Sequence, residues 1–212
     1  MRDRTLAIFG AAENAELAAF YFLRDRPDLE VKCFVTDRGA NSLLMDLPVI
    51  SEEEFLGKYS SGECRLFAPY VDGRDRQNKQ VQMEKLGYQF ETYISPHAQV
   101  WDTSAVGKNC FIQELNNIQY GTLVGDGCSF WAGNHIGHHG RISAFATFTS
   151  HVILSGRCAV GSGTYFGVNA TIRDGLTIGD DILIGQGSNV TQSLTEPGVY
   201  VGSPARYMKV WK

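Results

Sequence analysis

The chain has 212 residues, 43% of them hydrophobic and 20% charged, which is the composition of a folded protein large enough for two modest domains. Its formal net charge of −4, with no cluster of Lys and Arg, argues against a nucleic-acid partner. The sequence contains no run of about 18 apolar residues that could cross a bilayer, so we expect no membrane partner either.

The N-terminal stretch MRDRTLAIFGAAEN does not resemble a signal peptide, because it lacks the apolar region and the cleavage site of small residues. The five cysteines are odd in number and form no CxxC pair, which favours reduced thiols over a disulfide framework. Both features predict a cytoplasmic protein.

Residues 1–90 are expected to form an α/β domain of the Rossmann-like type. The stretch TLAIFGA predicts a buried strand, AENAELAAFYFLRD a helix and EVKCFVTD a second strand, which together make a βαβ unit. The spacing of Leu17, Phe20 and Leu23 predicts the helix face that packs on the core. A third strand, CRLFAPYVD, and a helix ended by Gly87, RDRQNKQVQMEKLG, follow before YQFETYISP leads into the next domain.

The turn after the first predicted strand, Gly10-Ala11-Ala12, is the candidate substrate-binding site of this domain. In folds of this kind, backbone N–H groups at the start of a helix bind nucleotide phosphates. The turn lacks the GxGxxG pattern, so a dinucleotide is not expected. Asp37, at the end of the second strand, is either an acceptor of hydrogen bonds from a ribose or base, or an acid in solvent. We expect Gly10, Ala11, Ala12 and Asp37 to bind the nucleotide part of a substrate.

An unbroken series of apolar residues occupies every sixth position of the second half of the chain. The series is Ile94, Val100, Val106, Ile112, Ile118, Val124, Phe130, Ile136, Ile142, Phe148, Leu154, Val160, Phe166, Ile172, Ile178, Ile184 and Val190. With this composition, seventeen apolar residues in a row are roughly a one-in-a-million coincidence. Four residues after each of them lies a second series, in which fourteen of sixteen side chains are small.

This six-residue period predicts a parallel β-helix. Side chains of a strand alternate between its faces, so each apolar residue and the small residue two before it point inward together. Three six-residue units complete one coil of 18 residues, and successive coils stack about 4.8 Å apart. Glycine often follows the apolar residue, where we expect the chain to turn sharply. The period continues for about five and a half coils, which predicts a β-helix over residues 91–193 and a C-terminal tail over 194–212.

Three of the five histidines, His135, His138 and His139, lie within the stretch GNHIGHH. In the six-residue register all three point away from the core, His138 and His139 at a corner and His135 on a strand. They are open to three interpretations: a catalytic base, ligands of a metal ion, or solvated corner residues. The 18-residue period places Asp102 and Asp174 in the column of His138, with no second histidine, so we expect no metal.

Several motifs resemble those of the NeuD/PglD-like sugar acyltransferases, a family of hexapeptide-repeat proteins. They are ISPHAQV, the GNHIGHH corner, FGVNATIRDGLTIG and the closing GVYVGSPAR, and they follow a small Rossmann-like domain. The resemblance implies that the β-helix is left-handed and that the protein is a homotrimer, with acetyl-CoA bound in grooves between neighbouring β-helices. Family contacts with coenzyme A correspond to Thr147, Gly156, Val168 and Gln186.

The same resemblance assigns the role of catalytic base to His138. An acid often follows this histidine in the family and orients it, whereas His139 follows it here. The orienting group is therefore unassigned, and His139 is the second catalytic candidate.

The leading functional expectation is transfer of an acetyl group from acetyl-CoA to the amino group of a nucleotide-linked deoxyamino sugar, for surface glycan synthesis. Such a reaction needs a base near neutral pKa, which imidazole supplies, and proximity of the reactants. O-acetylation of a sugar hydroxyl, as in the sialic acid enzymes, is the alternative and demands a stronger base. A zinc hydratase like the gamma carbonic anhydrases and a non-catalytic scaffold are further alternatives.

Overall fold

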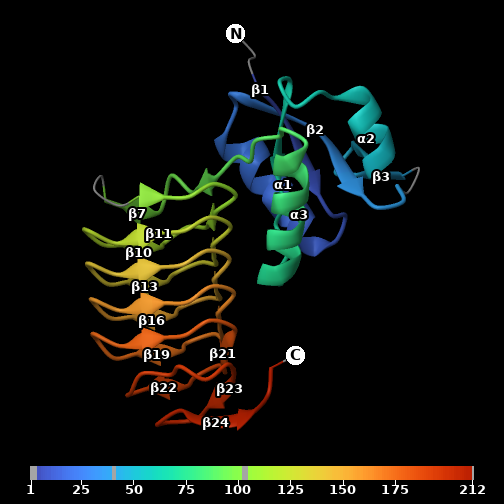
Figure 1. Ribbon diagram of the computed structural model, residues 1–212. Helices are drawn as coiled ribbons and strands as arrows, with labels where there is room; N and C mark the ends of the chain where they lie inside the picture. Colours follow the sequence, from blue (N-terminus) through green and yellow to red (C-terminus); the bar gives the residue numbers. More distant parts are fainter. Residues whose placement is uncertain (1–3, 40–41, 102–104, 212) are drawn as a thin grey trace. The chain divides into compact units, whose positions relative to one another are not determined.

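The computed structural model describes residues 4–39, 42–101 and 105–211. They fold as two compact units: the first ends at Tyr93 and the second begins at Ile94, except that Asp72–Arg74 belong to the second. Figure 1 shows a sheet with helices in the first unit and a stack of similar coils in the second. No helix in the described part of the chain has the length and apolar character needed to cross a membrane.

A five-stranded sheet with the order β3-β4-β2-β1-β5 forms the centre of the first unit. Its parallel strands are β4 (Leu47–Ser51), β2 (Leu29–Thr36), β1 (Arg4–Phe9) and β5 (Cys64–Phe67), and β3 (Ser42–Leu44) is antiparallel at one edge. The helices are α1 (Glu13–Asp25), α2 (Glu52–Lys58) and α3 (Gly73–Lys85). Because β1 and β2 pair in parallel and α1 connects them, the predicted βαβ unit is confirmed. The sequence pattern does not predict β3, β4 or α2.

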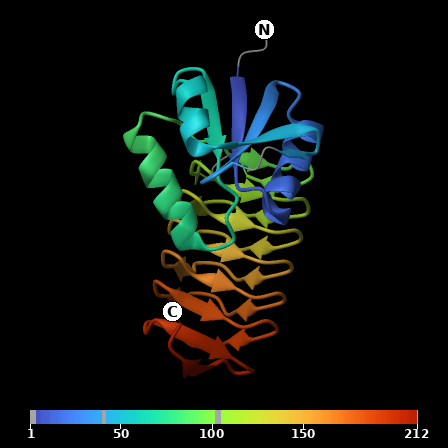
Figure 2. The same cartoon turned by 90° about the vertical axis from the view of Figure 1, so that its right-hand side faces the viewer.

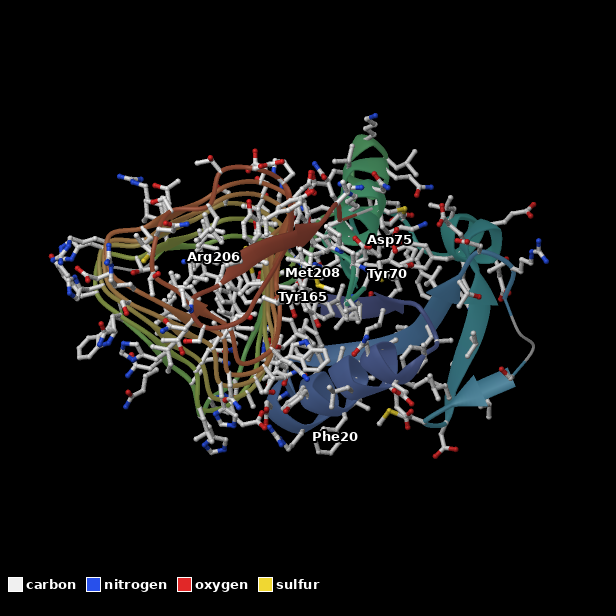
Figure 3. All side chains as sticks on the ribbon, turned by 90° about the horizontal axis from the view of Figure 1, so that it is seen from below. Phe20, Tyr70, Asp75, Tyr165, Arg206 and Met208 are labelled. Carbon is white, nitrogen blue, oxygen red and sulfur yellow. The ribbon has the colours of Figure 1, made fainter. Side chains whose placement is uncertain are left out.

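The buried face of α1 differs from the predicted one. Leu17, Phe20 and Leu23, predicted to face the core, are 37%, 46% and 48% exposed, and Figure 3 shows Phe20 projecting away from the sheet. The buried residues of α1 are Ala15, Ala18, Ala19, Tyr21 and Phe22. Four of these follow the i, i+3, i+4, i+7 spacing of one helix face, and three of the four are alanines, which let the helix backbone approach the sheet closely. The prediction was wrong because it weighed side-chain size above this spacing.

The second unit is a parallel β-helix whose strands form three sheets. The β7 sheet contains β7 (Gln99–Val100), β10 (Asn117–Ile118), β13 (His135–Ile136), β16 (Ile153–Leu154), β19 (Thr171–Ile172) and β22 (Asn189–Val190). The β8 sheet contains β8 (Ala105–Val106), β11 (Leu123–Val124), β14 (Arg141–Ile142), β17 (Ala159–Val160) and β20 (Thr177–Ile178). The β6 sheet contains β6 (Tyr93–Ile94), β9 (Phe111–Ile112), β12 (Ser129–Phe130), β15 (Thr147–Phe148), β18 (Tyr165–Phe166), β21 (Ile182–Ile184), β23 (Gly198–Val201) and β24 (Arg206–Lys209).

Strand pairing follows the predicted 18-residue period. His135 pairs with Asn117 in the coil before it and with Ile153 in the coil after it. Figure 2 shows these coils stacked one on another. The stretch after residue 193, expected as a C-terminal tail, supplies two further strands to the β6 sheet: β23 pairs in parallel with β21, and β24 is antiparallel to β23.

The six-residue apolar series forms the core of the β-helix. Every member from Ile112 to Val190 is buried, and the rings of Phe130, Phe148 and Phe166 stack with centroids 4.7 and 4.4 Å apart. The first member, Ile94, departs from the prediction, since it is 38% exposed. It lies in the first coil, which no earlier coil of the β-helix covers.

The glycines after the apolar residues have a different cause from the predicted one. In each six-residue repeat, the left-handed backbone conformation occurs two residues after this glycine position, as at His139 with φ of 55° and Gly121 with φ of 74°. A Cβ atom added to Gly125 would lie 2.8 Å from the backbone nitrogen of Ala144 in the next coil. At Gly125 glycine is therefore required because the next coil passes too close for a side chain.

Candidate active site

His138 and His139 lie at the corner between β13 and β14, and backbone hydrogen bonds fix this corner to the coils on both sides. The N–H of His138 donates to Oε1 of Gln119 at 3.1 Å, and the N–H of His139 donates to the carbonyl of Tyr120 at 3.0 Å. The N–H of Arg157 donates to the carbonyl of His138 at 2.8 Å. The side chain of His138 is half-buried and that of His139 is exposed. The sequence register therefore placed both imidazoles correctly, outside the core.

The two imidazoles contact each other directly. Their Nδ1 atoms are 3.0 Å apart, and the ring planes are nearly perpendicular, at 85°. The ring of Tyr120 meets that of His139 edge to face, with centroids 5.5 Å apart. His139, the next residue in the sequence, thus supplies the hydrogen-bonding partner of His138.

Two glycines make room for the imidazole pair. A Cβ atom added to Gly156 would lie 2.8 Å from Nε2 of His138, and one added to Gly121 would lie 3.1 Å from Cδ2 of His139. Gly121 belongs to the coil before the histidines and Gly156 to the coil after them. The pair therefore occupies a slot in which Nε2 of His138 faces a residue without a side chain.

The geometry gives no support to a metal centre at this corner. Within the described ranges, no three His, Cys, Asp or Glu side chains lie close enough together to hold a metal ion. The carboxylate of Asp174 accepts a hydrogen bond from Arg157 at 2.9 Å. Asp102, which the period places in the same column, lies outside the described residues. His135 is half-buried on β13, on the strand that leads into the corner.

The four candidate contacts with coenzyme A fall at two places on the β-helix. Gly156 lies beside His138, at the corner after β16. Val168 and Gln186 lie at a second corner of the β-helix, after β18 and β21, and the N–H of Gly187 donates to the carbonyl of Val168 at 2.8 Å. Val168 and Gln186 are thus one coil apart, as predicted. Thr147 is buried on β15, in the sheet that leads to this second corner.

The candidate residues of the first unit gather at the carboxyl edge of its parallel strands. Gly10 follows β1 and Asp37 follows β2, so parallel pairing places both at one edge. Ala11 and Ala12 are exposed, and α1 begins after Ala12, whose side chain makes no capping hydrogen bond. At this edge of the sheet α1 therefore begins, and the first turn of α1 has no side-chain cap.

Three residues that sequence reasoning missed complete this edge. Lys79 on α3 pairs with Glu52 at 2.5 Å, and its Nζ is 4.0 Å from Asp37. Burial, together with Asp37 and Glu52, raises the pKa of Tyr70 to about 12. A Cβ atom on Gly10 would lie 3.9 Å from the Tyr70 ring. The only sequence signal for Lys79 is its place one turn before the buried Met83 on α3, which does not distinguish it from other polar residues of that helix.

Curated relatives match parts of the chain, while no protein-family model matches it. The chain is 34% identical over 77 residues to a UDP-3-O-acylglucosamine N-acyltransferase from Caulobacter sp. strain K31, which is 36% of this chain and 23% of that protein. It is 26% identical over 115 residues to an acyl-[acyl-carrier-protein]--UDP-N-acetylglucosamine O-acyltransferase from Sinorhizobium fredii, which is 51% of this chain and 43% of that protein. The matches thus span less than half the length of these relatives.

Solved structures match over nearly the whole chain. A histidine-to-asparagine mutant of perosamine N-acetyltransferase from Caulobacter crescentus, in complex with CoA and GDP-perosamine, has a TM-score of 0.89 at 23% identity and 96% coverage of both chains. The acetyltransferase domain of PglB from Neisseria gonorrhoeae FA1090 has a TM-score of 0.90 at 21% identity, covering 97% of this chain and 100% of that one. WeeI from Acinetobacter baumannii AYE has 0.85 at 19% identity, with the same coverage. The predicted resemblance to NeuD/PglD-like sugar acyltransferases is confirmed at the level of the fold.

Proposed function

We propose that the protein transfers an acetyl group from acetyl-CoA to the amino group of a nucleotide-linked deoxyamino sugar, in the synthesis of a surface glycan. The observation that carries the proposal is the arrangement of His138, whose Nδ1 contacts a second imidazole while Nε2 faces Gly156. Support comes from the fold, which is shared with an N-acetyltransferase solved with CoA and GDP-perosamine and with an acetyltransferase domain solved with acetyl coenzyme A.

In the proposed reaction His138 is the general base. Its Nε2 takes a proton from the amine as the amine nitrogen attacks the thioester carbonyl carbon. The tetrahedral intermediate then collapses, the C–S bond breaks, and coenzyme A leaves with the electron pair as thiolate, which takes up a proton. Holding amine and thioester beside His138 supplies the proximity that the bimolecular reaction lacks in water. No metal is needed for any of these steps.

An amine fits this base better than a hydroxyl. The partner of His138 at Nδ1 is an imidazole rather than a carboxylate, so the base lacks the negative charge that would strengthen it. An amine near its own pKa is already partly unprotonated at neutral pH, whereas a hydroxyl near pKa ~15 is not. We therefore propose N-acetylation rather than O-acetylation.

We propose a homotrimer with coenzyme A bound between neighbouring chains. Gly156 and the pair Val168 and Gln186 lie at different corners of one β-helix, so a groove along a single corner cannot include both sets. A groove between two chains related by a threefold axis takes one corner from each. Closed cyclic symmetry satisfies this requirement for all three grooves at once.

We propose that the first unit binds the nucleotide. The start of α1 after Gly10 offers backbone N–H groups to the phosphates. The charge of Lys79 is already balanced by Glu52 at 2.5 Å, so the phosphates depend on the backbone groups. The exposed carboxylate of Asp37 accepts hydrogen bonds from a ribose or base. Glu13 and Glu16 in the first turn oppose a phosphate and have to point away from it.

The test is a thiol-release assay with acetyl-CoA and a panel of nucleotide-linked amino sugars, with mass spectrometry of the product. The expected product is heavier than the acceptor by one acetyl group, carries the acetyl on nitrogen, and forms much more slowly with His138→Ala. If neither amino sugars nor sugar hydroxyls are acetylated, and coenzyme A does not raise the melting temperature, the proposal is wrong and a non-catalytic scaffold is favoured.

A further inference from the structure

We infer that His139 is a positioning residue that accepts a hydrogen bond from Nδ1–H of His138 and so leaves Nε2 of His138 free to act as the base. This inference rests on the proposed function of His138. The group that orients His138, which the sequence leaves unassigned, is then an imidazole rather than an acid.

The distance between the two Nδ1 atoms limits the protonation of the pair. At 3.0 Å they form a hydrogen bond only if one nitrogen carries the hydrogen and the other presents its lone pair. A neutral imidazole carries one hydrogen on its two nitrogens. If His138 is the donor, its Nε2 is unprotonated; if His139 is the donor, Nε2 of His138 carries the hydrogen and cannot accept a proton from the amine.

The surroundings of the two Nε2 atoms favour His138 as the donor. Nε2 of His138 lies beside Gly156, which has no side chain that could accept a hydrogen bond from an N–H there. The side chain of His139 is exposed, so an Nε2–H on that ring can bond to water. An unsatisfied N–H in a half-buried site is costly, and the arrangement with Nε2–H on His139 avoids it.

The backbone holds His139 in the orientation that this hydrogen bond needs. Consecutive side chains of extended backbone point to opposite faces. His139 has the left-handed φ of 55°, which turns its ring back toward His138, and its N–H is bonded to Tyr120. The equivalent positions one coil before and two coils after are glycines, Gly121 and Gly175, for which this conformation costs least. Arg157, at the equivalent position one coil after, has φ of 58° without being glycine, so the corner itself sets this conformation and the histidine adopts it as other residues do.

The consequence for catalysis is that His139 acts on the chemical step and not on binding. When Nε2 of His138 takes the amine proton, the imidazolium still donates Nδ1–H to His139, which spreads the new positive charge over two rings. His139 itself needs no contact with either substrate. Its loss is therefore expected to lower kcat and to leave both KM values nearly unchanged.

The chain itself suggests matched variants. Phe145 and Asn169 occupy the same left-handed position at other corners of the β-helix, with φ of 62° and 59°. His139→Phe therefore suits the backbone and keeps a ring but removes the acceptor. His139→Asn also suits the backbone and retains an acceptor oxygen at the distance of Nδ1 from the main chain. The pair of variants separates the hydrogen bond from the shape of the side chain.

The experiment combines kinetics with ¹⁵N NMR of the imidazole nitrogens of the whole protein at alkaline pH, where neutral imidazoles show their tautomers. We expect Nδ1–H on His138 in the wild type and in His139→Asn, and Nε2–H in His139→Phe. We expect kcat to fall about 10- to 100-fold in His139→Phe, and to recover in His139→Asn to within about threefold of the wild type.

Two results would overturn the inference: Nε2–H on His138 in the wild type, or a His139→Phe variant with the wild-type tautomer and kcat. The NMR reading does not depend on turnover. If no acceptor is acetylated but the tautomer of His138 changes in His139→Phe, the proposed function fails while the pairing of the imidazoles stands.

Discussion

Nε2 of His138 lies where the side chain of residue 156 would begin: a Cβ atom on Gly156 would be 2.8 Å from it. Gly156 has no positive φ, so the backbone alone does not require glycine at this position. The absence of a side chain instead keeps open the space beside the proposed base. Gly156 was predicted only as a contact of coenzyme A, and we propose this second role for it from its position beside His138.

Gly156→Ala is expected to lower the activity of the protein without unfolding it. The new methyl group displaces the imidazole of His138, which is the mobile partner, rather than the backbone. We expect kcat to fall about 10- to 100-fold, with little change in the melting temperature. Gly140→Ala is the control, because its Cβ atom would meet Thr122 at 3.4 Å and the carbonyl oxygen of Cys158 at 3.5 Å, which are ordinary contact distances. Equal activity of the two variants would contradict the assigned role of Gly156.

His138→Ala is expected to lower kcat/KM by about 10² to 10⁴, the usual cost of losing a general base. His138 is a half-buried corner residue, and its loss leaves the buried apolar column of the β-helix intact, so circular dichroism and melting temperature should change little. His97→Ala, at an exposed position of the first coil, is the control for loss of an imidazole. A His138→Ala protein within about threefold of wild-type activity would remove His138 from the mechanism.

The sequence predicts the β-helix better than the first unit because the two rest on different signals. In the β-helix one apolar side chain recurs at each sixth position, and stacking repeats the same contact in every coil, as with Phe130, Phe148 and Phe166. In α1 a single helix has two plausible apolar faces, and the alanines that pack on the sheet carry a weaker signal than Phe20.

The candidate site shows the same limit. The register predicts that His138 and His139 lie outside the core, but not that their Nδ1 atoms meet, because this depends on the φ of a single residue. Lys79 reaches the neighbourhood of Asp37 from a helix more than 40 positions later in the chain, and no local pattern indicates this contact.

Asp37→Ala is expected to raise the KM of the nucleotide-linked acceptor about 10- to 100-fold, the effect of one lost hydrogen bond to a charged group. The KM of acetyl-CoA and the turnover of a free amino sugar should stay unchanged, because the proposed role of Asp37 concerns the nucleotide alone. Glu30→Ala, an exposed acid at the other end of β2, is the control for loss of a negative charge. An unchanged acceptor KM in Asp37→Ala would leave the first unit without a role in nucleotide binding.

Mixing two inactive variants is expected to restore part of the activity if the acetyl-CoA groove lies between chains. His138→Ala damages one wall of the proposed groove, and Val168→Asp places a charge in the other, at a partly exposed position on a different corner. In trimers reassembled at random from equal amounts, about one groove in four receives an intact His138 from one chain and an intact Val168 from its neighbour. We therefore expect about a quarter of wild-type activity after joint denaturation and refolding, and almost none from either variant alone.

Light scattering should give the mass of three chains. Recovery that stays at the level of the single variants would instead place both walls in one chain, and a monomer with full activity would exclude the shared groove altogether.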